Sequence, residues 1–304
     1  MNTLDEFIVT GDSHIRADVP TCRVQEQEEW IDTQMNCLQS LVEKANEKKI
    51  PILHTGDLFH TSQVQDWLKN KVLDVLSNAQ HGVWMIPGNH DLPWHNTKFR
   101  QQCSYSIVAR FLLGDAWDLL GEGVSVQAYD FGTEPEQEIA PYDIVMTHQL
   151  VFPDEKSRVV ISGKAMGKIP DDFKEQFPNS KIILLGDYHR NFQVFNGKQT
   201  IINPGCMTRQ AADFKNYQPV FYHVRKKDEN IAVNLIEFPD TEPVVTDEYL
   251  RKNEQRDERL EAFIETIQNA GAVSLSYKDN VERLLMGVVK PETKRIIKEI
   301  IENI

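Results

Sequence analysis

The feature that most constrains this chain is a series of short polar clusters, each placed directly after an apolar run rich in β-branched residues. The apolar runs predict buried strands over residues 7–10, 50–54, 83–86, 143–147 and 181–185. The clusters that follow are Gly11-Asp12-Ser13-His14, Gly56-Asp57-Leu58-Phe59-His60, Gly88-Asn89-His90-Asp91, Thr147-His148 and Gly186-Asp187-Tyr188-His189. Sites in α/β proteins lie at the carboxyl ends of strands, so we expect these clusters to form one site.

Helical patterns separate the early strands. Residues 24–49, 63–79 and 98–113 carry apolar side chains at helical spacing, so the chain alternates between strand and helix. Further strands are predicted over 124–128, 192–195, 200–202, 220–224 and 231–236, with a hairpin turn at Asn196-Gly197. This order predicts an α/β fold in which a second sheet, richer in hairpins, packs on the first.

Length and composition set the domain organisation. The chain has 304 residues, and 40% of them are hydrophobic, which is enough for one large packed domain with a small appendage. We expect the large domain over 1–240 and a helical C-terminal region over 241–304. Within that region, helices are predicted over 247–270, 279–289 and 291–303.

Charge and targeting signals narrow the class of protein. The net charge of −13 argues against a simple nucleic-acid binder, although residues 156–227 carry 13 basic and only 5 acidic side chains. The four cysteines lack close paired spacing, so the sequence predicts neither a disulfide framework nor a zinc knuckle. No signal-peptide pattern occurs, and no apolar run approaches the ~20 residues of a membrane span. We expect a cytoplasmic protein, associated with the nucleoid or, if viral, located in the host cytoplasm.

Each polar cluster alone is typical of a turn, but the five together predict a metal site. In Asp12-x-His14 and Asp187-x-His189 the two polar residues share one face of an extended segment. Carboxylate, imidazole and amide ligands without thiolates favour manganese, iron or a similar metal over structural zinc. Two divalent ions about 3.5–4 Å apart, sharing one carboxylate, would suit in-line attack on a phosphate ester.

The order of these motifs resembles that of the calcineurin-like metallophosphoesterases: Asp-x-His, Gly-Asp, Gly-Asn-His-Asp or Glu, a lone His, and Gly-His-x-His. The likeness spans about residues 5–237. It implies a four-layer α/β/β/α sandwich, here with a small helical C-terminal extension. It also implies that Asp12, His14, Asp57 and His189 bind one metal ion, and that Asp57, Asn89, His148 and Asp187 bind the other.

The resemblance further implies roles for residues beside the metals. His90 would protonate or stabilise the leaving oxygen, Asp91 would orient His90, and His60 would lie near the substrate. At Asp187 this sequence departs from the family, which usually has histidine there. The additional carboxylate leads us to expect a harder, more manganese-selective site.

Two segments resemble the SbcD-type DNA repair nucleases within that superfamily. They are Gly56-Asp57-Leu58-Phe59-His60, and Asn203-Pro204-Gly205 followed by Arg209. Arg190 and Arg209 flank the site in sequence and could hold phosphates, with exposure to solvent as the alternative. Tyr188 lies between two predicted ligands, where it could stack on a base or line the cleft.

This resemblance implies a two-metal DNA exonuclease or endonuclease that processes DNA ends in repair or recombination with an SbcC-type coiled-coil ATPase. The isoleucine stripe within 291–304 would dock on that ATPase or pack on its own domain. Helices 63–79 and 98–113 would form a homodimer interface or simply cover the sheet. Metal motifs specify the reaction and not the leaving group, so two alternatives remain. One is a phosphoesterase for a small phosphoester or nucleotide, and the other is a metal-free scaffold of the same fold.

Overall fold

The computed structural model describes residues 4–112, 119–121, 124–133, 142–161, 164–227, 230–240, 242, 244–248, 285 and 293–295. The chain separates into two compact units, Met1–Thr246 and Asp247–Ile304. In the second unit Glu248, Leu285 and residues 293–295 are helical. The helices predicted over 247–270, 279–289 and 291–303 otherwise lie outside the described residues.

The first sheet contains five strands in the order β13-β12-β1-β2-β3. They are β1 (Glu6–Thr10), β2 (Ile52–His54), β3 (Val83–Met85), β12 (Val220–Lys227) and β13 (Asn230–Glu237). β1, β2 and β3 are parallel, whereas β12 runs antiparallel to both β1 and β13. The first three polar clusters therefore emerge at the same edge of this sheet.

The second sheet contains six strands in the order β10-β11-β9-β6-β5-β4. They are β4 (Leu119–Gly121), β5 (Val124–Tyr129), β6 (Ile144–His148), β9 (Ile182–Gly186), β10 (Phe192–Phe195) and β11 (Thr200–Asn203). The central strands β5, β6, β9 and β11 are parallel, and β4 and β10 are antiparallel to their neighbours. The last two polar clusters follow β6 and β9. A separate hairpin pairs β7 (Val160–Ile161) with β8 (Lys164–Ala165).

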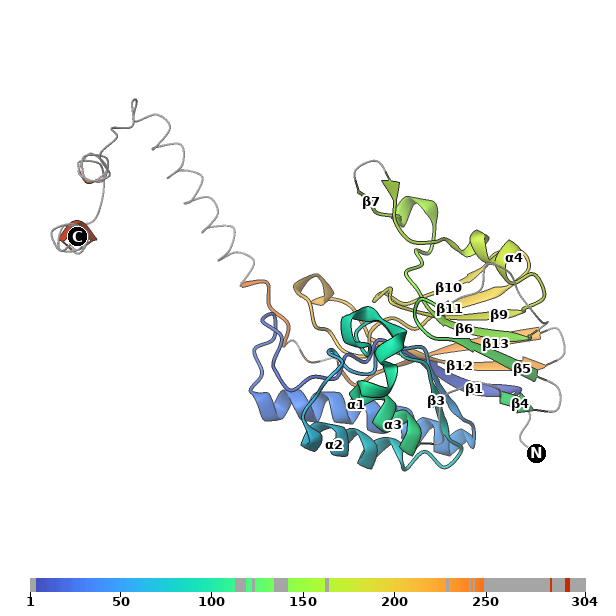
Figure 1. Ribbon diagram of the computed structural model, residues 1–304, viewed down its shortest axis with the longest axis horizontal. Coiled ribbons are helices and arrows are strands. Elements are labelled where there is room, and N and C mark those ends of the chain that lie inside the picture. The colour runs from blue at the N-terminus through green and yellow to red at the C-terminus, as the bar shows by residue number, and fades with distance from the viewer. Residues whose placement is uncertain are drawn as a thin grey trace, which may run out of the picture. The chain divides into compact units, whose positions relative to one another are not determined.

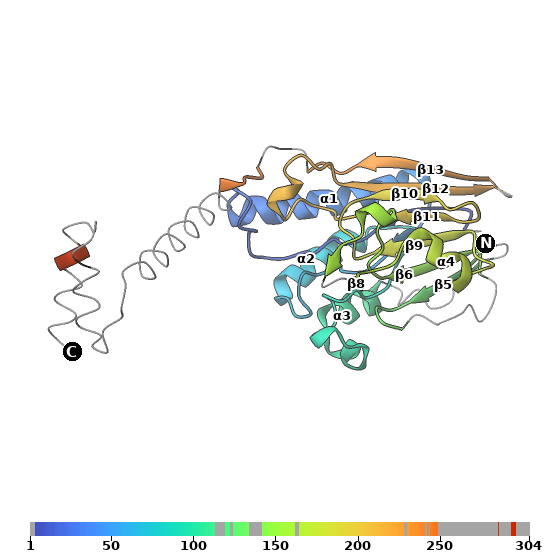
Figure 2. The ribbon, with the colours of Figure 1, turned by 90° about the horizontal axis from the view of Figure 1, so that it is seen from above.

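The two sheets lie between helical layers, as Figure 1 shows. On the first sheet lie α1 (Gln27–Lys48), α2 (Asp66–Leu76) and α3 (Ser104–Phe111), and on the second lies α4 (Phe173–Gln176). Short 3₁₀ helices cover Pro93–His95, Thr97–Gln102, Glu155–Ser157, Pro170–Asp172 and Ala212–Phe214. Seen from above, the strands of both sheets lie roughly along a common axis (Figure 2). The predicted α/β/β/α fold class is confirmed.

Alternating side chains of the strands build three apolar cores. On β1, Phe7 and Val9 lie in the core between the sheets, whereas Ile8 packs against the helices of the first layer. On the far side, Ile183 of β9 packs against Phe173 of α4. Burial of both faces explains why these strands read as continuous apolar runs in the sequence.

The predicted helix over 98–113 is divided in the structure. Thr97–Gln102 is a 3₁₀ helix, Cys103 has extended backbone, and α3 begins at Ser104. Ser104 fixes the break, because its N–H donates to the Ser62 carbonyl at 2.9 Å and its hydroxyl accepts from the Val64 N–H at 3.0 Å.

The apolar stripes of α2 and α3 lie in the core between the helices and the first sheet. Their size is accounted for without a second copy of the chain. Ile107 and Phe111 of α3 remain exposed, so a homodimer interface at these helices stays a prediction. Among the described residues, no helix is long and apolar enough to cross a membrane.

Candidate active site

The polar clusters meet where the strands of both sheets end. Backbone hydrogen bonds join the first two, from the Asp12 N–H to the Gly56 carbonyl and from the His14 N–H to the Asp57 carbonyl, both at 2.9 Å. Asp12, His14, Asp57 and Asp187 all have positive φ, between 43° and 85°. Such backbone strain in non-glycine residues concentrates at functional sites, and here it falls on four predicted metal ligands.

One group of side chains matches the first predicted metal site. Ligand atoms of Asp12, His14 and His189 all lie within 4.8 Å of one another. The Nε2 atoms of His14 and His189 are 3.0 Å apart, and His14 Nε2 lies 3.5 Å from Asp57 Oδ2. A single ion could therefore be bound by both rings and by the shared carboxylate of Asp57.

A second group lies beside the first. Ligand atoms of Asp12, Asp57 and His148 are also mutually within 4.8 Å. His148 Nε2 is 3.4 Å from Asp57 Oδ2 and 3.1 Å from Asn89 Oδ1. Asp187 belongs to neither group, but its backbone N–H donates to the Asp12 carboxylate at 3.1 Å. The structure thus brings the predicted ligands together with Asp57 between the two groups.

Glycines allow the strand ends to approach this closely. A Cβ on Gly88 would collide with the carboxylate of Asp57, and a Cβ on Gly186 would collide with Nδ1 of His148. Nδ1 of His148 is hydrogen-bonded to the carbonyl oxygen of Thr55 at 2.8 Å. This contact turns the opposite ring nitrogen, Nε2, toward Asp57.

The buried carboxylates of the site favour the binding of a cation. Burial, reinforced by the charges of Asp57 and Asp187, raises the pKa of Asp12 well above its usual value. Burial opposes the charged form of His148, yet Asp57, Asp12 and Asp187 together raise its pKa to about 10. A cluster of buried carboxylates that forces a proton onto a buried imidazole is a site suited to cations.

The donor set fits a pair of divalent metal ions. Burial lowers the pKa of both His14 and His189, which keeps their rings neutral with lone pairs free for a metal. Asp57 Oδ2 is buried and has no hydrogen-bond partner among the described residues, at the point between the two groups. It lies 3.4 Å from Nε2 of His148 and 3.5 Å from Nε2 of His14, so a cation held between these side chains would satisfy it.

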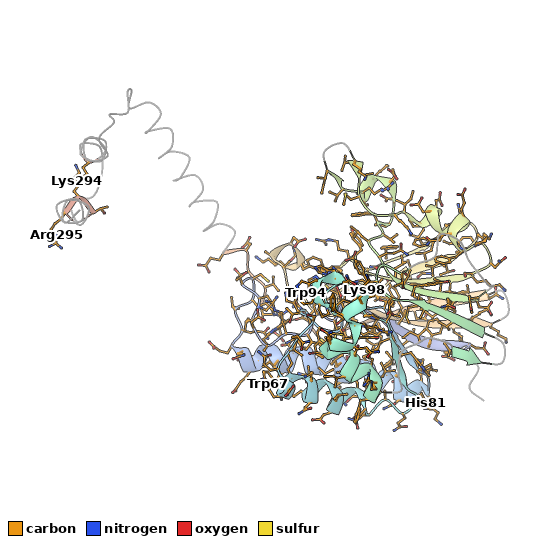
Figure 3. The ribbon with its side chains drawn as sticks, viewed as in Figure 1. Trp67, His81, Trp94, Lys98, Lys294 and Arg295 are labelled. Atoms are coloured by element: carbon orange, nitrogen blue, oxygen red, sulfur yellow. The ribbon has the colours of Figure 1, made fainter. Side chains whose placement is uncertain are left out.

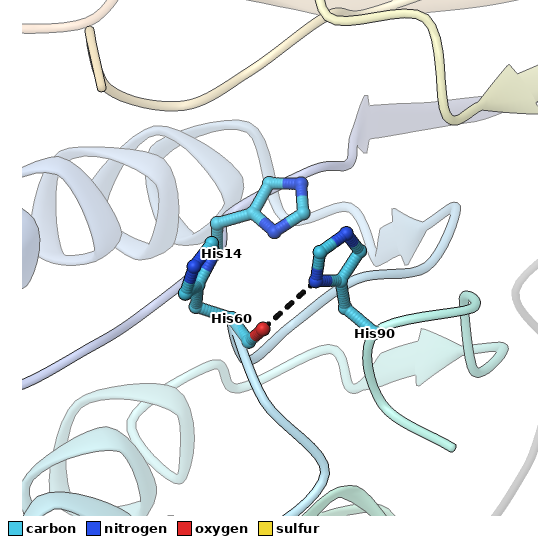
Figure 4. A group of neighbouring side chains, drawn as sticks. All are labelled: His14, His60 and His90. Atoms are coloured by element: carbon cyan, nitrogen blue, oxygen red, sulfur yellow. Dashed lines mark hydrogen bonds between the residues drawn. The ribbon is translucent and has the colours of Figure 1, made fainter. Parts of the chain in front are cut away.

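His90 and His60 lie beside this cluster, next to His14 (Figure 4). The His90 ring centroid is 4.8 Å from that of His14 and 5.3 Å from that of His60. His90 Nδ1 is 2.8 Å from the backbone carbonyl of His60, so Nδ1 carries a hydrogen and Nε2 is left for the substrate. The predicted location of His60 near the reacting groups agrees with this geometry.

Asp91 does not orient His90, contrary to the expectation. Its buried carboxylate accepts three backbone hydrogen bonds instead, from Leu58 at 3.1 Å, Phe59 at 2.9 Å and Gly88 at 3.1 Å. Asp91 therefore ties the end of β3 to the segment that follows β2. The His60 carbonyl occupies the orienting position that had been expected for Asp91.

Of the two arginines predicted to hold phosphate, Arg209 is engaged by a buried partner, whereas Arg190 is 45% exposed beside an exposed carboxylate and its role remains a prediction. Arg209 is buried, with its guanidinium bonded to Asp240 at 3.2 Å. Arg190 pairs with Asp213 at 2.9 Å and lies over the ring of Phe214. Arg209 can be buried because Asp240 pairs with it. Asp240 is distant in the sequence, so no local sequence pattern indicates this pairing.

Tyr188 is also placed differently from the expectation. Its ring packs between Phe152 and Phe192, with centroids at 5.3 Å and 6.0 Å, in the core on the outer face of the second sheet. Although Tyr188 lies between two predicted ligands in sequence, alternation turns its side chain away from theirs. This position gives no support to stacking of Tyr188 on a substrate base.

A pocket beside the metal ligands contains residues that the sequence argument missed. Its volume is about 150 Å³, and it is lined by His14, His60, His90 and His189 together with Arg16, Cys206, Thr208, Gln210, Ala211 and Phe214. Arg16 continues the alternation that begins at Asp12 and His14, which is a signal that could have identified it. The segment over 206–214 had no such periodic signal.

The chain matches the calcineurin-like phosphoesterase family over residues 6–191, and it belongs to that family. Over 197 residues it is 23% identical to the 3′,5′-cyclic adenosine monophosphate phosphodiesterase CpdA of Haemophilus influenzae, covering 60% of this chain and 71% of that protein. The chain is thus a metal-dependent phosphoesterase, a hydrolase of ester bonds, and its described residues include groups that could hold divalent metal ions.

Solved structures with a similar arrangement include TT1561 of Thermus thermophilus, at a TM-score of 0.47 and 12% identity, with 76% of this chain and 99% of that chain covered. Another is an archaeal phosphodiesterase at a TM-score of 0.40 and 10% identity, with 76% and 99% covered.

Proposed function

We propose that this protein hydrolyses phosphodiester bonds of small nucleotide substrates with two divalent metal ions, manganese being the expected metal. The observation that carries the proposal is the pocket of about 150 Å³ directly against the predicted ligands His14 and His189. A pocket of this size suits one small organic group beside the scissile phosphate. The similarity to a cyclic nucleotide phosphodiesterase supports the same class of substrate.

The residues of the site divide the reaction between them. When bound, two divalent ions would lower the pKa of water and offset negative charge on the phosphoryl oxygens. Asp12, His14, Asp57 and His189 would hold one ion, and Asp57, Asn89, His148 and Asp187 the other. His90 keeps a hydrogen on Nδ1 through the His60 carbonyl, so Nε2 is the atom that can give a proton to the leaving oxygen.

The proposal is tested with a panel of cyclic and linear nucleotide diesters in the presence of manganese. We expect His90→Ala to lower kcat by roughly 10²–10⁴-fold with bound metal unchanged, because proton transfer is lost. His81→Ala is the matched control, since this histidine lies in the turn before β3, away from Trp94 and Lys98 (Figure 3). Hydrolysis that needs neither metal nor His90 would contradict the proposal, and absence of both activity and metal would favour the scaffold alternative.

The identity of the metal rests on Asp187, where the family resemblance leads one to expect histidine. A third carboxylate among the predicted ligands favours a hard ion, so wild type should prefer manganese over zinc or nickel. Asp187→His is expected to move that preference toward the softer ions. Activity titrations with the three metals measure the change, and an unaltered order of preference would reject the role given to Asp187.

A second candidate is cleavage of DNA, favoured by a cationic surface on the segment that follows β3. Lys98 and Arg110 line one open pocket there together with Arg100, which pairs with Asp130 at 3.1 Å, and Trp94 is 78% exposed. The ring centroid of Trp94 lies 4.9 Å from that of Phe99, which follows Lys98 in the chain; Trp94 and Lys98 are labelled in Figure 3. Cations with an exposed aromatic ring are the elements that bind a nucleic-acid strand.

This candidate predicts manganese-dependent degradation of linear single- or double-stranded DNA. Binding by the isolated chain would be weak and salt-sensitive, because the contacts are mostly to phosphates. Lys98→Ala should weaken binding, and Lys174→Ala, on α4, should not. Tight binding that is insensitive to salt would contradict this mode, and nucleotide hydrolysis without DNA cleavage would leave the first candidate.

If DNA is the substrate, we propose that an SbcC-type ATPase supplies much of the affinity by binding the isoleucine stripe within 291–304. Ile297→Glu with Ile301→Glu should then abolish capture of the ATPase without changing hydrolysis of nucleotides. Capture by the double variant at the wild-type level would refute this docking role.

A further inference from the structure

We infer that Arg16 and Gln210 recognise the substrate: Arg16 donates to a phosphate oxygen, and Gln210 accepts a hydrogen bond from a hydroxyl or amino group of the esterified nucleoside. This inference rests on the proposed function and deepens it. It gives the phosphate-binding role to an arginine other than Arg190 and Arg209.

Both residues share a pocket with the reacting groups. Arg16 and Gln210 line the cavity that contains His14, His60, His90 and His189. Thr208 and Phe214 complete the same wall. A guanidinium, an amide, a hydroxyl and an aromatic ring are the groups that bind a phosphorylated sugar or base.

Unsatisfied polar atoms concentrate at this pocket. Arg16 Nε and Gln210 Oε1 are buried and lack hydrogen-bond partners among the described residues, as does His60 Nδ1. Buried polar atoms without partners are few in native proteins, so several around one cavity indicate a missing ligand. One of the two new atoms is a donor and the other is an acceptor, which matches an anion carrying a hydroxyl or amino group.

The surrounding structure holds both side chains in place. The Arg16 N–H donates a hydrogen bond to Oε1 of the buried Gln34 on α1, and Gln34 Nε2 donates to the Arg16 carbonyl, at 2.9 Å each. Gln210 Nε2 donates to the His14 carbonyl at 3.1 Å and to the Thr208 hydroxyl at 3.0 Å, which leaves Oε1 as the atom of the amide without a hydrogen-bond partner among the described residues. Such preorganisation lowers the entropic cost of binding.

Arg16 also has an ion pair that leaves part of its guanidinium free. Nη2 contacts the exposed carboxylate of Asp18, whereas Nε is turned to the buried side. Arg158 provides a matched control. Its side chain is equally exposed, at 20%, and it pairs with an exposed acidic neighbour, Glu155, but it does not line this pocket.

The test measures inhibition by inorganic phosphate together with KM for two substrates, a nucleotide diester and a dialkyl phosphodiester without a nucleoside. Arg16→Ala should raise the phosphate inhibition constant and both KM values by roughly 10–100-fold, because a charge-assisted hydrogen bond is lost. Arg16→Lys should fall between Arg16→Ala and wild type. Gln210→Leu should raise KM for the nucleotide alone.

Gln193, an exposed residue of β10 that does not line the pocket, is the control for Gln210. Arg158→Ala and Gln193→Leu should leave every value within twofold of wild type, and metal content should be unchanged in all variants. Loss of metal in Arg16→Lys, or phosphate inhibition in Arg16→Ala at the wild-type level, would overturn the inference. If wild type hydrolyses neither diester, the proposed function fails. Direct titration of manganese-loaded wild type and Arg16→Ala with inorganic phosphate still tests Arg16.

Discussion

His90 and Asp91 are neighbours in the chain, yet they face different surroundings. His90 is directed by a backbone carbonyl and faces the pocket, whereas Asp91 is fully buried among backbone N–H groups. Their side chains point in different directions. The motif Gly88-Asn89-His90-Asp91 therefore supplies both a candidate proton donor and a residue that holds two strand ends together. The motif alone could not separate these roles.

Asp91→Asn tests the bracing role. The side chain of asparagine has one acceptor oxygen where aspartate has two, so one buried N–H loses its acceptor. We expect the free energy of unfolding to fall by about 2 kcal/mol. Metal affinity should weaken, since Asp91 holds the ends of β2 and β3 together. The pH profile of kcat should keep its shape. Unchanged stability with a displaced pH profile would instead support the orienting role first expected for Asp91.

At the scale of elements, the site depends on strand ends that approach more closely than side chains normally allow. The parallel strands β1, β2 and β3 deliver their clusters to one edge, and β6 with β9 deliver theirs from the second sheet. Glycine at the end of β3 permits contact with Asp57, which follows β2. The arrangement of the predicted metal ligands therefore depends on both sheets.

Gly88→Ala should separate the ends of β2 and β3, because the new methyl group collides with the Asp57 carboxylate. We expect bound metal to fall and kcat/KM to drop at least about tenfold, as misplaced catalytic groups do. Gly197→Ala is the control. It has φ +89° and open space around it, so it should cost about 1 kcal/mol of stability with activity retained. Equal metal content in Gly88→Ala and wild type would contradict the steric argument.

At the scale of the whole first unit, a buried cluster of charges joins distant parts of the chain. Asp240 bonds to Arg23 at 2.8 Å and to Arg209 at 3.2 Å, and all three side chains are buried. Arg23 also lies over the ring of Trp30 at 4.5 Å. The cluster fixes the segment over 206–214 that forms one wall of the pocket. This explains why Arg209, which lies between the pocket residues Thr208 and Gln210 in the chain, does not itself face the pocket.

Asp240→Asn should lower the free energy of unfolding by about 3 kcal/mol at pH 7, because two guanidinium groups lose their buried partner. Burial alone would raise the pKa of Asp240, but hydrogen bonds from Arg23 and Arg209 lower it. The carboxylate therefore stabilises the fold above the ordinary aspartate pKa near 4, and this contribution is lost as pH falls through the lowered value. Denaturant unfolding of both proteins at pH 7, 5 and 3 should show the difference shrinking at the acidic end. A difference that does not depend on pH would contradict the assignment.

The sequence by itself determined the class of fold and the chemistry of the metal site. Continuous apolar runs mark buried strands, and polar residues at their ends follow from the way parallel strands terminate. Both signals are local. Asp12, His14, Asp57, Asn89, His148 and His189 could therefore be proposed as ligands from their motifs and the family resemblance, before any contact between them was known.

Only the tertiary structure decided which other side chains line the pocket. Arg209 and Arg16 have the same chemistry, but Arg209 meets an aspartate 31 residues away, whereas Arg16 opens onto the pocket. The family resemblance assigned Asp91 to orient His90, yet two of its three hydrogen-bond partners, Leu58 and Phe59, follow β2 and not β3. A charged side chain is directed by whichever partner satisfies it in the folded chain, and local sequence does not contain that partner.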